Sequence, residues 1–335
     1  MKFMNYKLFD DMKNKLYFCK NFKMKKIAVF YYTQSGQALQ IAQSICQPLE
    51  AAGNSVIYKA IEPEEPFPFP WSCWSFFEAF PESRLAIPTG KLKEIDFSDV
   101  ADADLVVISG QSWYLAPSLP LHAFFQDEKV QAYLKGKPIV NISGCRNMWV
   151  MAQRKIRDYI GQADGRYVGH IVLQDKAPNL VSVLTIIRWL FYNKKAASRF
   201  LPAAGVRDDD IKNASRFGIV INETLATGNW DDLQNKLMRE KAVEYKAGLA
   251  FMEKTGHRIF GIWAKFIRKK GGYQDKKRAL RIRLFCFYLF FVLYVASPVG
   301  MLVFWLTYPL RIRKIKKIRR EMCYELSRKI IFFQP

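Results

Sequence analysis

The tetrapeptide Thr33-Gln-Ser-Gly36 has residue types suited to binding a phosphate group. It follows the apolar run Ile27-Ala-Val-Phe-Tyr-Tyr32 and precedes a segment whose apolar residues have helical spacing. Hydroxyls and successive backbone N–H groups at the start of a helix supply the donors that a dianionic phosphate needs. Gly36 lets the backbone approach such a ligand closely, because it has no side chain. The alternative interpretation is an ordinary turn between a strand and a helix.

Two further segments have side chains suited to a flat, polar ligand. Ser109-Gly-Gln-Ser-Trp-Tyr114 contains two aromatic rings, Trp113 and Tyr114, which can stack on a ring system. Gly144-Cys-Arg-Asn-Met-Trp149 offers backbone N–H groups and a cation, Arg146, suited to an anionic ring or a substrate carboxylate. Core packing of the two aromatic residues, and pairing of the arginine with a nearby acid, remain the alternatives.

The elements that position these segments follow from the alternation of apolar runs with helical patterns, which predicts βαβ units and a parallel sheet. The expected strands are 26–32, 55–60, 104–109, 138–143 and 166–173, and the expected helices are 37–52, 148–160, 179–192 and 208–227. Five strands at this spacing suit the order 2-1-3-4-5, in which ligands bind at the carboxyl ends of the strands. All three segments follow strands one, three and four, so we expect them to meet at the switch point between strands one and three.

The first of these segments resembles the flavodoxin phosphate loop, Ser/Thr-x-Thr-Gly-Asn-Thr. Thr33, Ser35, Gly36 and Gln37 fill its first positions, and Ala38 replaces the last Thr, which removes one hydroxyl contact. The resemblance implies a flavodoxin-like three-layer α/β sandwich that binds FMN. It assigns cofactor binding to Thr33, Gln34, Ser35, Gly36, Gln37, Gly110, Gln111, Ser112, Trp113, Tyr114, Gly144, Cys145, Arg146 and Asn147.

An aromatic insertion occupies residues 61–100 of the expected domain, which spans 24–228. Its segment Pro66-Phe-Pro-Phe-Pro-Trp-Ser-Cys-Trp-Ser-Phe-Phe77 alternates prolines with aromatic residues. Proline neither extends a helix nor fits a central strand. We therefore expect an ordered aromatic loop.

The basic charge of the chain is concentrated at its ends. The net charge is +22, of which residues 1–23 contribute +4 and residues 254–335 contribute +17, so the region between them is close to neutral. A near-neutral body argues against a nucleic-acid partner and in favour of a basic membrane-surface region. Residues 1–23 lack the continuous apolar run of a signal peptide. We expect them to be an unstructured extension, with Met24 as the natural start.

Cysteine and histidine are too scattered to predict a metal site or a disulfide framework. The six cysteines form no CxxC pair, which is typical of a reducing cytoplasmic setting, and only three histidines are present. Cys145 precedes an expected helix, but no histidine near it in sequence would activate the thiol. We expect an inert thiol there, and structural roles for His122 on a helix and His170 in a strand.

Residues 229–335 form a basic helical extension that contains an uncharged, apolar stretch, 284–310. At about 1.5 Å per residue this stretch is long enough to cross a hydrocarbon core of about 30 Å. Its flanks, 278–283 and 311–320, are both strongly basic, and basic flanks prefer the cytoplasmic side. Because Ser297-Pro-Val-Gly300 interrupts the stretch, a re-entrant hairpin with both ends cytoplasmic is expected at least as much as a single span. A buried pair of soluble helices is the alternative.

Several segments together resemble a narrower group, the bacterial dialkylresorcinol condensing enzyme family, over about residues 24–230. They are Tyr31-Tyr-Thr-Gln-Ser-Gly-Gln37, Pro66-Phe-Pro-Phe-Pro-Trp71, Trp113-Tyr-Leu-Ala-Pro-Ser118, Arg146-Asn-Met-Trp-Val-Met-Ala-Gln153 and Asn179-Leu-Val-Ser-Val-Leu-Thr-Ile-Ile-Arg-Trp189. The resemblance implies a ketosynthase partner and a role in making dialkylresorcinol lipids, as in flexirubin or aryl polyene-type pathways. It implies a long-chain lipid or polyketide substrate at the cytoplasmic face of the inner membrane.

The chemistry of such a pathway suggests a task for a flavin. Condensing two β-keto chains gives a cyclohexanedione, which must lose two hydrogens to become a resorcinol. A flavin accepts the hydride while a base removes the proton. Arg146 and Tyr114 are the candidates for catalytic residues. The alternatives are a membrane-associated FMN-dependent oxidoreductase of the NAD(P)H:quinone type and a cofactor-free scaffold for the ketosynthase.

Overall fold

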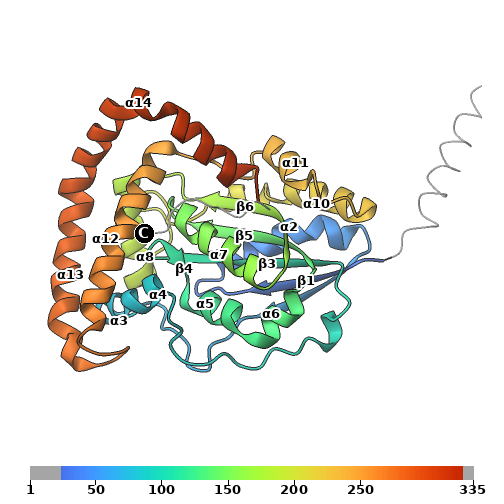
Figure 1. Cartoon of the computed structure of the whole chain (residues 1–335), viewed down its shortest axis with the longest axis horizontal. Helices are drawn as coiled ribbons and strands as arrows, with labels where there is room; N and C mark the ends of the chain where they lie inside the picture. Colours follow the sequence, from blue (N-terminus) through green and yellow to red (C-terminus); the bar gives the residue numbers. More distant parts are fainter. Residues whose placement is uncertain (1–23, 327–335) are drawn as a thin grey trace, which may run out of the picture.

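A parallel β-sheet forms the centre of the molecule, whose computed structural model describes residues 24–326 (Figure 1). The predicted extension 1–23 lies outside the described residues. The strands are β1 (Lys26–Tyr31), β2 (Ser55–Ala60), β3 (Leu105–Trp113), β4 (Ala116–Pro117), β5 (Pro138–Cys145) and β6 (Arg166–Gln174). The five long strands pair in parallel in the order β2-β1-β3-β5-β6, which confirms the predicted 2-1-3-4-5 arrangement.

Both faces of the sheet are buried, which explains why its strands are continuous apolar runs. Successive residues of β1 alternate between the two hydrophobic cores: Ile27 and Val29 face one, and Ala28 and Phe30 face the other. All four side chains are 0% exposed.

Helices cover the two faces as separate layers (Figure 1). One core joins the sheet to α2, α10 and α11, and the other joins it to α5, α6 and α7. The α-helices are α2 (Gln37–Ala51), α3 (Cys73–Glu78), α4 (Phe80–Leu85), α5 (Leu119–Gln126), α6 (Glu128–Leu134), α7 (Val150–Gln162), α8 (Asn179–Tyr192), α9 (Asp208–Lys212), α10 (Ser215–Thr227), α11 (Leu233–Arg239), α12 (Ala247–Arg268), α13 (Ala279–Phe291) and α14 (Ser297–Cys323). This is the three-layer architecture that the sequence predicts.

The third strand is longer than the sequence predicts. It continues to Trp113 and turns through Tyr114 and Leu115, whose φ angles are 50° and 64°, into the short antiparallel strand β4. Two consecutive residues with positive φ are what a two-residue hairpin requires. The hairpin therefore occupies part of the segment that follows the expected strand 104–109, and it adds a sixth strand.

The aromatic insertion is only partly a loop. Residues 66–70, with their three prolines, lie outside any helix or strand, but Ser72 accepts a hydrogen bond from the Ser75 N–H and begins α3, which α4 follows directly. The expectation of a loop through Phe77 was therefore wrong after Ser72, because the proline run ends at Pro70.

The predicted helix 208–227 is two helices, α9 and α10. The chain tightens between them, where Ala214 N–H donates to the carbonyl of Ile211 and Phe217 N–H to that of Ala214. The offset brings Gly218 against α2, where an added Cβ would lie 1.9 Å from the carbonyl oxygen of Ile45. Close contact between the two helices thus depends on this glycine.

A long helical run forms one edge of the molecule (Figure 1). It extends from Lys276 to Cys323 through α13, a π-helical turn (Val292–Ala296, here the π turn) and α14. Within the described residues it is the one helix long and apolar enough to cross a membrane, and 6% of its most apolar window is buried. The chain does not reverse at Ser297-Pro-Val-Gly300, so the run is a continuous helix and not a hairpin.

Candidate functional site

The turn after β1 leaves the start of α2 without a side-chain cap. Gly36 occupies the N-cap position with φ 81°, and no described side chain bonds to the first N–H groups of the helix. Uncapped N–H groups at a helix start, together with the positive end of the helix dipole, attract an anion. The turn therefore has the local structure of a phosphate site.

Pairing of β3 with β5 brings the other two predicted segments together at the same end of the sheet. Gln111 pairs with Gly144, the last residue pair before the chains diverge. The three segments thus surround one cavity of about 240 Å³, here the switch-point cavity. Its lining consists of Gln34, Ser35, Gln37, Ala38, Ile41, Phe69, Trp71, Phe76, Gln111, Ser112, Trp113, Tyr114, Gly144, Cys145, Arg146, Ile186, Trp189, Leu190 and Gly205.

Ten of the fourteen residues predicted to bind the cofactor line this cavity, and Thr33, Gly36, Gly110 and Asn147 do not. Thr33 lines a neighbouring hollow, and its buried Oγ1 has no partner among the described residues. Gly36 contributes the turn itself. Gly110 is buried against Leu121, and Asn147 donates to the side-chain oxygen of Asn179 at 2.8 Å.

Trp113 and Tyr114 are held by protein contacts. Trp113 meets the ring of Trp71 edge-on at 5.4 Å and that of Phe67 at 5.1 Å. Tyr114 donates its hydroxyl to the backbone carbonyl of Phe76, and burial raises the pKa of the phenol well above its usual range. Tyr114 is therefore a hydrogen-bond donor to α3, and it is not a proton acceptor at neutral pH.

Arg146 is the only charged residue among the described residues that line the cavity. Its Nη1 donates to the backbone oxygen of Asn179 at 3.0 Å, to the Asn179 side chain at 2.9 Å and to Ser182 Oγ at 3.0 Å. Burial lowers the pKa of the guanidinium, and the charge of Asp175 opposes that shift. The sequence left an ion pair with a nearby acid as the alternative. In the structure, three oxygen atoms at the start of α8 hold the Arg146 guanidinium instead.

Cys145 lacks the surroundings of a nucleophile. Burial raises the pKa of its thiol, and the carboxylate of Glu253 raises it further. His122 is engaged elsewhere, with Tyr159 and the carbonyl of Ser83, and burial lowers the pKa of its imidazole to about 3. The inert thiol expected from the sequence agrees with this environment. In the part of the chain that the structure describes, no group of His, Cys, Asp or Glu could hold a metal ion.

Sequence reasoning missed the residues that close the cavity. The aromatic insertion contributes Phe69, Trp71 and Phe76, and Trp71 donates through Nε1 to the Gln34 side chain at 3.2 Å. Helix α8 supplies a further wall, including Trp189. The unusual proline and aromatic run marked the insertion as ordered, but nothing in its composition indicated which loop it would cover.

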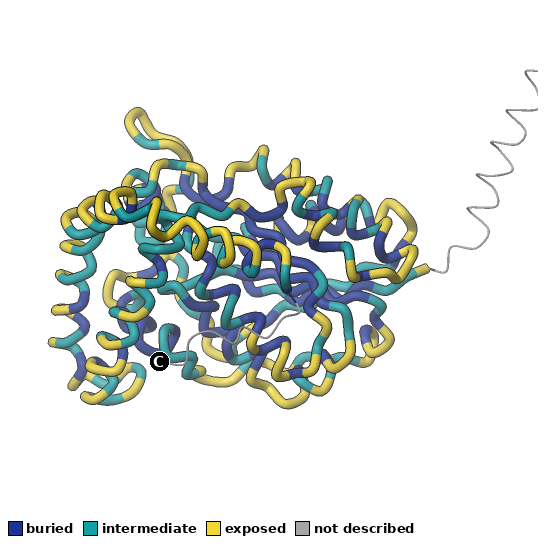
Figure 2. Tube along the Cα trace, turned by 45° about the horizontal axis from the view of Figure 1, so that its top comes forward, coloured by how far each residue is buried: buried dark blue, intermediate teal, exposed yellow. Residues whose placement is uncertain are grey.

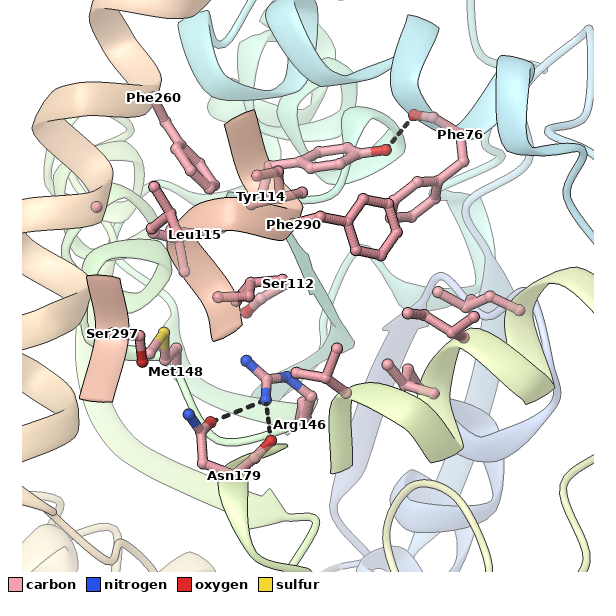
Figure 3. Close-up of a pocket in the computed structure, with 18 of the residues that line it drawn as sticks. Phe76, Ser112, Tyr114, Leu115, Arg146, Met148, Asn179, Phe260, Phe290 and Ser297 are labelled. Carbon is pink, nitrogen blue, oxygen red and sulfur yellow. Dashed lines mark hydrogen bonds between the residues drawn. The ribbon is translucent and has the colours of Figure 1, made fainter. Parts of the chain in front are cut away.

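A second cavity of about 260 Å³, here the apolar cavity, adjoins the first (Figure 3). The two share lining residues Phe76, Ser112, Tyr114, Cys145, Arg146, Ile186 and Leu190. Figure 3 shows Arg146 and Asn179 at one end and aromatic side chains, among them Phe260 and Phe290, at the other. The remaining walls come from α8, α12, α13 and the π turn. Both cavities are thus lined mainly by apolar side chains, and the switch-point cavity adds the polar side chains of Gln34, Ser35, Gln37 and Gln111.

Comparison with known proteins returns solved structures only. No protein-family model matches the chain, and no curated protein matches it. A flavodoxin from the domain Archaea is similar at 16% identity over 60% of this chain and 98% of its own, with a TM-score of 0.35. A flavoprotein in complex with FMN from Lactobacillus acidophilus is similar at 15% identity over 44% of this chain and 93% of its own, with a TM-score of 0.35.

A flavone reductase is similar at 12% identity over 62% of this chain and 67% of its own, with a TM-score of 0.36. Similarity at this level concerns the course of the chain and says nothing of its chemistry. The fold itself is defined by the observed strand order and by the two helix layers. On those grounds, the chain has a flavodoxin-like fold.

Proposed function

We propose that this protein is an FMN-dependent oxidoreductase that acts on an apolar substrate at a membrane surface. The observation that carries the proposal is the switch-point cavity. It lies at the carboxyl ends of the parallel strands, between the uncapped start of α2 and the loops after β3 and β5. Open α/β sheets bind their ligands at this position.

The residues present fit the two ends of FMN. The N–H groups at the start of α2 and the hydroxyl of Ser35, which lines the cavity, would hold the phosphate. Gln111 and Gly144, paired at the strand ends, would present backbone groups to the ring. Ala38 is buried and lines the cavity without adding a donor.

A bound FMN would supply a two-electron acceptor or donor for hydride. The chain itself contributes binding, orientation and exclusion of water. Within residues 24–326, Arg146 is the one positive charge bordering both cavities, so it would bind an anionic oxygen of the substrate. Phe76 and Trp71 cover the cavity and keep it apolar, which strengthens that interaction.

The substrate we favour is a dialkylated cyclohexane-1,3-dione, which becomes a dialkylresorcinol by losing one hydride and one proton. No carboxylate or imidazole belongs to the described residues lining either cavity. A 1,3-dione needs no strong base because its enolate forms readily, and Arg146 would stabilise that enolate. The apolar cavity would take an alkyl chain of the substrate. A ketosynthase would supply the dione, and basic flanks favour the cytoplasmic face of the inner membrane.

A second candidate is an FMN-dependent reductase of the NAD(P)H:quinone type. The apolar cavity favours this reductase because a lipid quinone, like the alkylated dione, combines a flat ring with a hydrocarbon tail. It differs in requiring a pyridine nucleotide as hydride donor and no ketosynthase.

Purification of the full chain in detergent, followed by a visible spectrum and titration with FMN, tests the cofactor. We expect flavin absorption at one FMN per chain, either as purified or after titration. Incubation with the cyclohexane-1,3-dione should then give the resorcinol, with one flavin reduced per product when oxygen is absent.

Two outcomes separate the candidates. Oxidation of NADH or NADPH that depends on quinone, with no resorcinol formed, would favour the reductase. Failure to bind FMN would overturn both enzyme proposals and leave the cofactor-free scaffold. Arg146→Lys is the matched variant for the aromatase, since it keeps the charge but loses the guanidinium, whose Nη1 binds three oxygens.

A further inference from the structure

The helical run from α13 to α14 has one packed side and one bare side. Apolar residues at intervals of three or four face outward, and each of them is more than half exposed: Phe287, Phe291, Val295, Val299, Leu302 and Leu306. Figure 2 shows exposed positions recurring along this run. A contiguous bare apolar stripe of this kind on a surface marks a contact with another apolar phase.

The packed side is fastened to the body at both ends of the run. Near its start, Phe285 stacks on Phe80 of α4 with ring centroids 3.8 Å apart. Just past its middle, Phe304 packs against Phe251 of α12 at 5.4 Å, and at its end Met322 and Cys323 belong to a hydrophobic core of the body. Between these points the run lines the apolar cavity. Between Phe285 and Phe304 the helix is thus a wall of the folded body, and lipid can reach its outer side there.

Exposed basic residues lie at both ends of the bare stripe. Seven basic residues within 311–320 are all exposed, and Arg283 is exposed before the stripe begins. If the helix crossed a membrane, one of these basic ends would have to reach the opposite side, against the preference of basic flanks. If it lies flat, both ends stay on one side, next to anionic headgroups.

We propose that the protein docks on an anionic lipid bilayer with α13 and α14 lying in the plane of the interface. We further infer that the apolar cavity receives the tail of an amphiphile directly from that bilayer. The second part rests on the proposed function, because it makes the cavity the tail subsite next to FMN. The proposal of docking rests only on the exposed stripe and the basic charges, and it does not depend on the proposed function.

Only one helix separates the lipid from the apolar cavity. Val292 and Leu293 of the π turn line the cavity, whereas Phe291 and Val295, next to them, face outward. Phe290 does both, since it lines the cavity and is 41% exposed. A π turn carries a local irregularity of the helix, and such turns are frequent at functional sites. The tail would enter past Phe290, with its polar head toward Arg146.

Co-sedimentation with vesicles tests docking. The full chain should bind vesicles containing phosphatidylglycerol, and the double variant Leu302→Lys/Leu306→Lys should bind on the order of 10- to 100-fold more weakly, because two apolar contacts are lost. Ile219→Lys is the matched control, since Ile219 is 53% exposed on α10, away from the stripe. Equal binding of the double variant and the control would overturn docking through this stripe.

Labelling of introduced cysteines with an impermeant maleimide separates a flat helix from a span. With Cys19→Ser, Cys73→Ser and Cys286→Ser as background, Arg283→Cys and Lys316→Cys should both react on the outside of sealed vesicles, whereas a span would protect one of them. A nitroxide on Val299→Cys gives a second, independent measure. It should lie about 5–10 Å deep in a flat helix, and about 15 Å deep, at the bilayer centre, in a span.

Loading of the cavity is tested with an anthroyloxy-labelled fatty acid carried in the vesicles, read by energy transfer from tryptophan. Gly256→Phe fills the cavity from α12, and Ile262→Phe is the control on the exposed side of that helix. We expect saturable transfer that Gly256→Phe reduces at least tenfold and Ile262→Phe leaves intact, with both variants showing an unchanged unfolding midpoint. Transfer that survives in folded Gly256→Phe would overturn loading. None of these readouts needs FMN, so they stand apart from a failure of the proposed function.

Discussion

The carboxylate of Glu253 on α12 accepts a hydrogen bond of 2.7 Å from the backbone N–H of Met151, in the first turn of α7. It also accepts one of 3.2 Å from Val150, so a side chain from a distant helix caps α7 where the loop after β5 ends. Glu253 is 1% exposed, and burial raises the pKa of its carboxyl to about 7, against the charge of Arg154 and the backbone hydrogen bonds. The contact ties the wall of the apolar cavity to the loop that carries Arg146.

This raised pKa predicts that the free energy of unfolding falls as pH rises from about 4.5 to about 7. In that window the folded chain keeps a proton on Glu253 that the unfolded chain has lost, so unfolding releases a proton. The full effect of this group is on the order of 3 kcal/mol and is complete above pH 7. Urea unfolding of the chain and of Glu253→Gln at several pH values checks it. The variant should lose this part of the pH dependence, and parallel curves for the two proteins would contradict the prediction.

A buried ion pair joins the start of the helical run that contains α13 and α14 to the aromatic insertion. Arg278 donates to both carboxylate oxygens of Glu82, at 2.7 and 2.8 Å, and both side chains are at most 1% exposed. We expect Glu82→Gln to lower stability by about 3–5 kcal/mol, because the guanidinium is left buried without its counter-charge. The double variant Glu82→Met/Arg278→Met should recover much of that loss. Thermal unfolding measures both, and a loss in the double variant as large as that in Glu82→Gln would argue against pairing as the cause.

Gly36 should be required for FMN affinity because its φ of 81° is unfavourable for other residues. We expect Gly36→Val to weaken FMN binding at least tenfold, measured by fluorescence titration. Gly53→Val is the matched control, since Gly53 has φ 85° in the turn after α2, away from the switch-point cavity. It should cost similar stability and leave FMN binding unchanged. Equal weakening in both variants would mean that the effect comes from strain alone.

Ala38 should be the weak contact with the phosphate. Ala38→Thr restores the hydroxyl that flavodoxins have at this position, next to the start of α2. A hydrogen bond to a charged phosphate contributes about 1.5 kcal/mol or more, so FMN should bind roughly tenfold more tightly. Calorimetric titration of the variant and the natural sequence measures the difference. Unchanged or weaker binding would show that the phosphate does not lie beside residue 38.

Much of the fold was accessible from the sequence because local pattern and global packing agree there. Residues 26–32 are apolar without alternation, as a strand buried on both faces must be, and the observed β1 and α2 match the expected bounds closely. Asn213 and Ala214 carry no comparable signal, and the break between α9 and α10 arises from the contact of Gly218 with α2. Tertiary contact decided the element boundary in that case.

The candidate site could be predicted from the sequence only where one rule applies, namely that parallel sheets bind ligands at the carboxyl ends of their strands. Loops after strands one, three and four had to meet, and ten predicted residues do so around one cavity. The bonds of Arg146 to Asn179, 33 residues away, and the cover formed by Trp71 depend on how α8 and the insertion pack. No spacing in the sequence encodes those contacts. The apolar stretch 284–310 had the composition of a span, but composition alone could not indicate that one of its sides is packed.

The single-helix wall between the bare stripe and the apolar cavity has a kinetic consequence. A substrate that reaches the cavity only from the lipid is present at a two-dimensional concentration, expressed as its mole fraction in the bilayer. Adding inert lipid at constant total substrate should then slow the reaction by surface dilution, whereas adding buffer should not. The enzyme would respond to how crowded the membrane is with its substrate, whatever the volume of the cytoplasm around it.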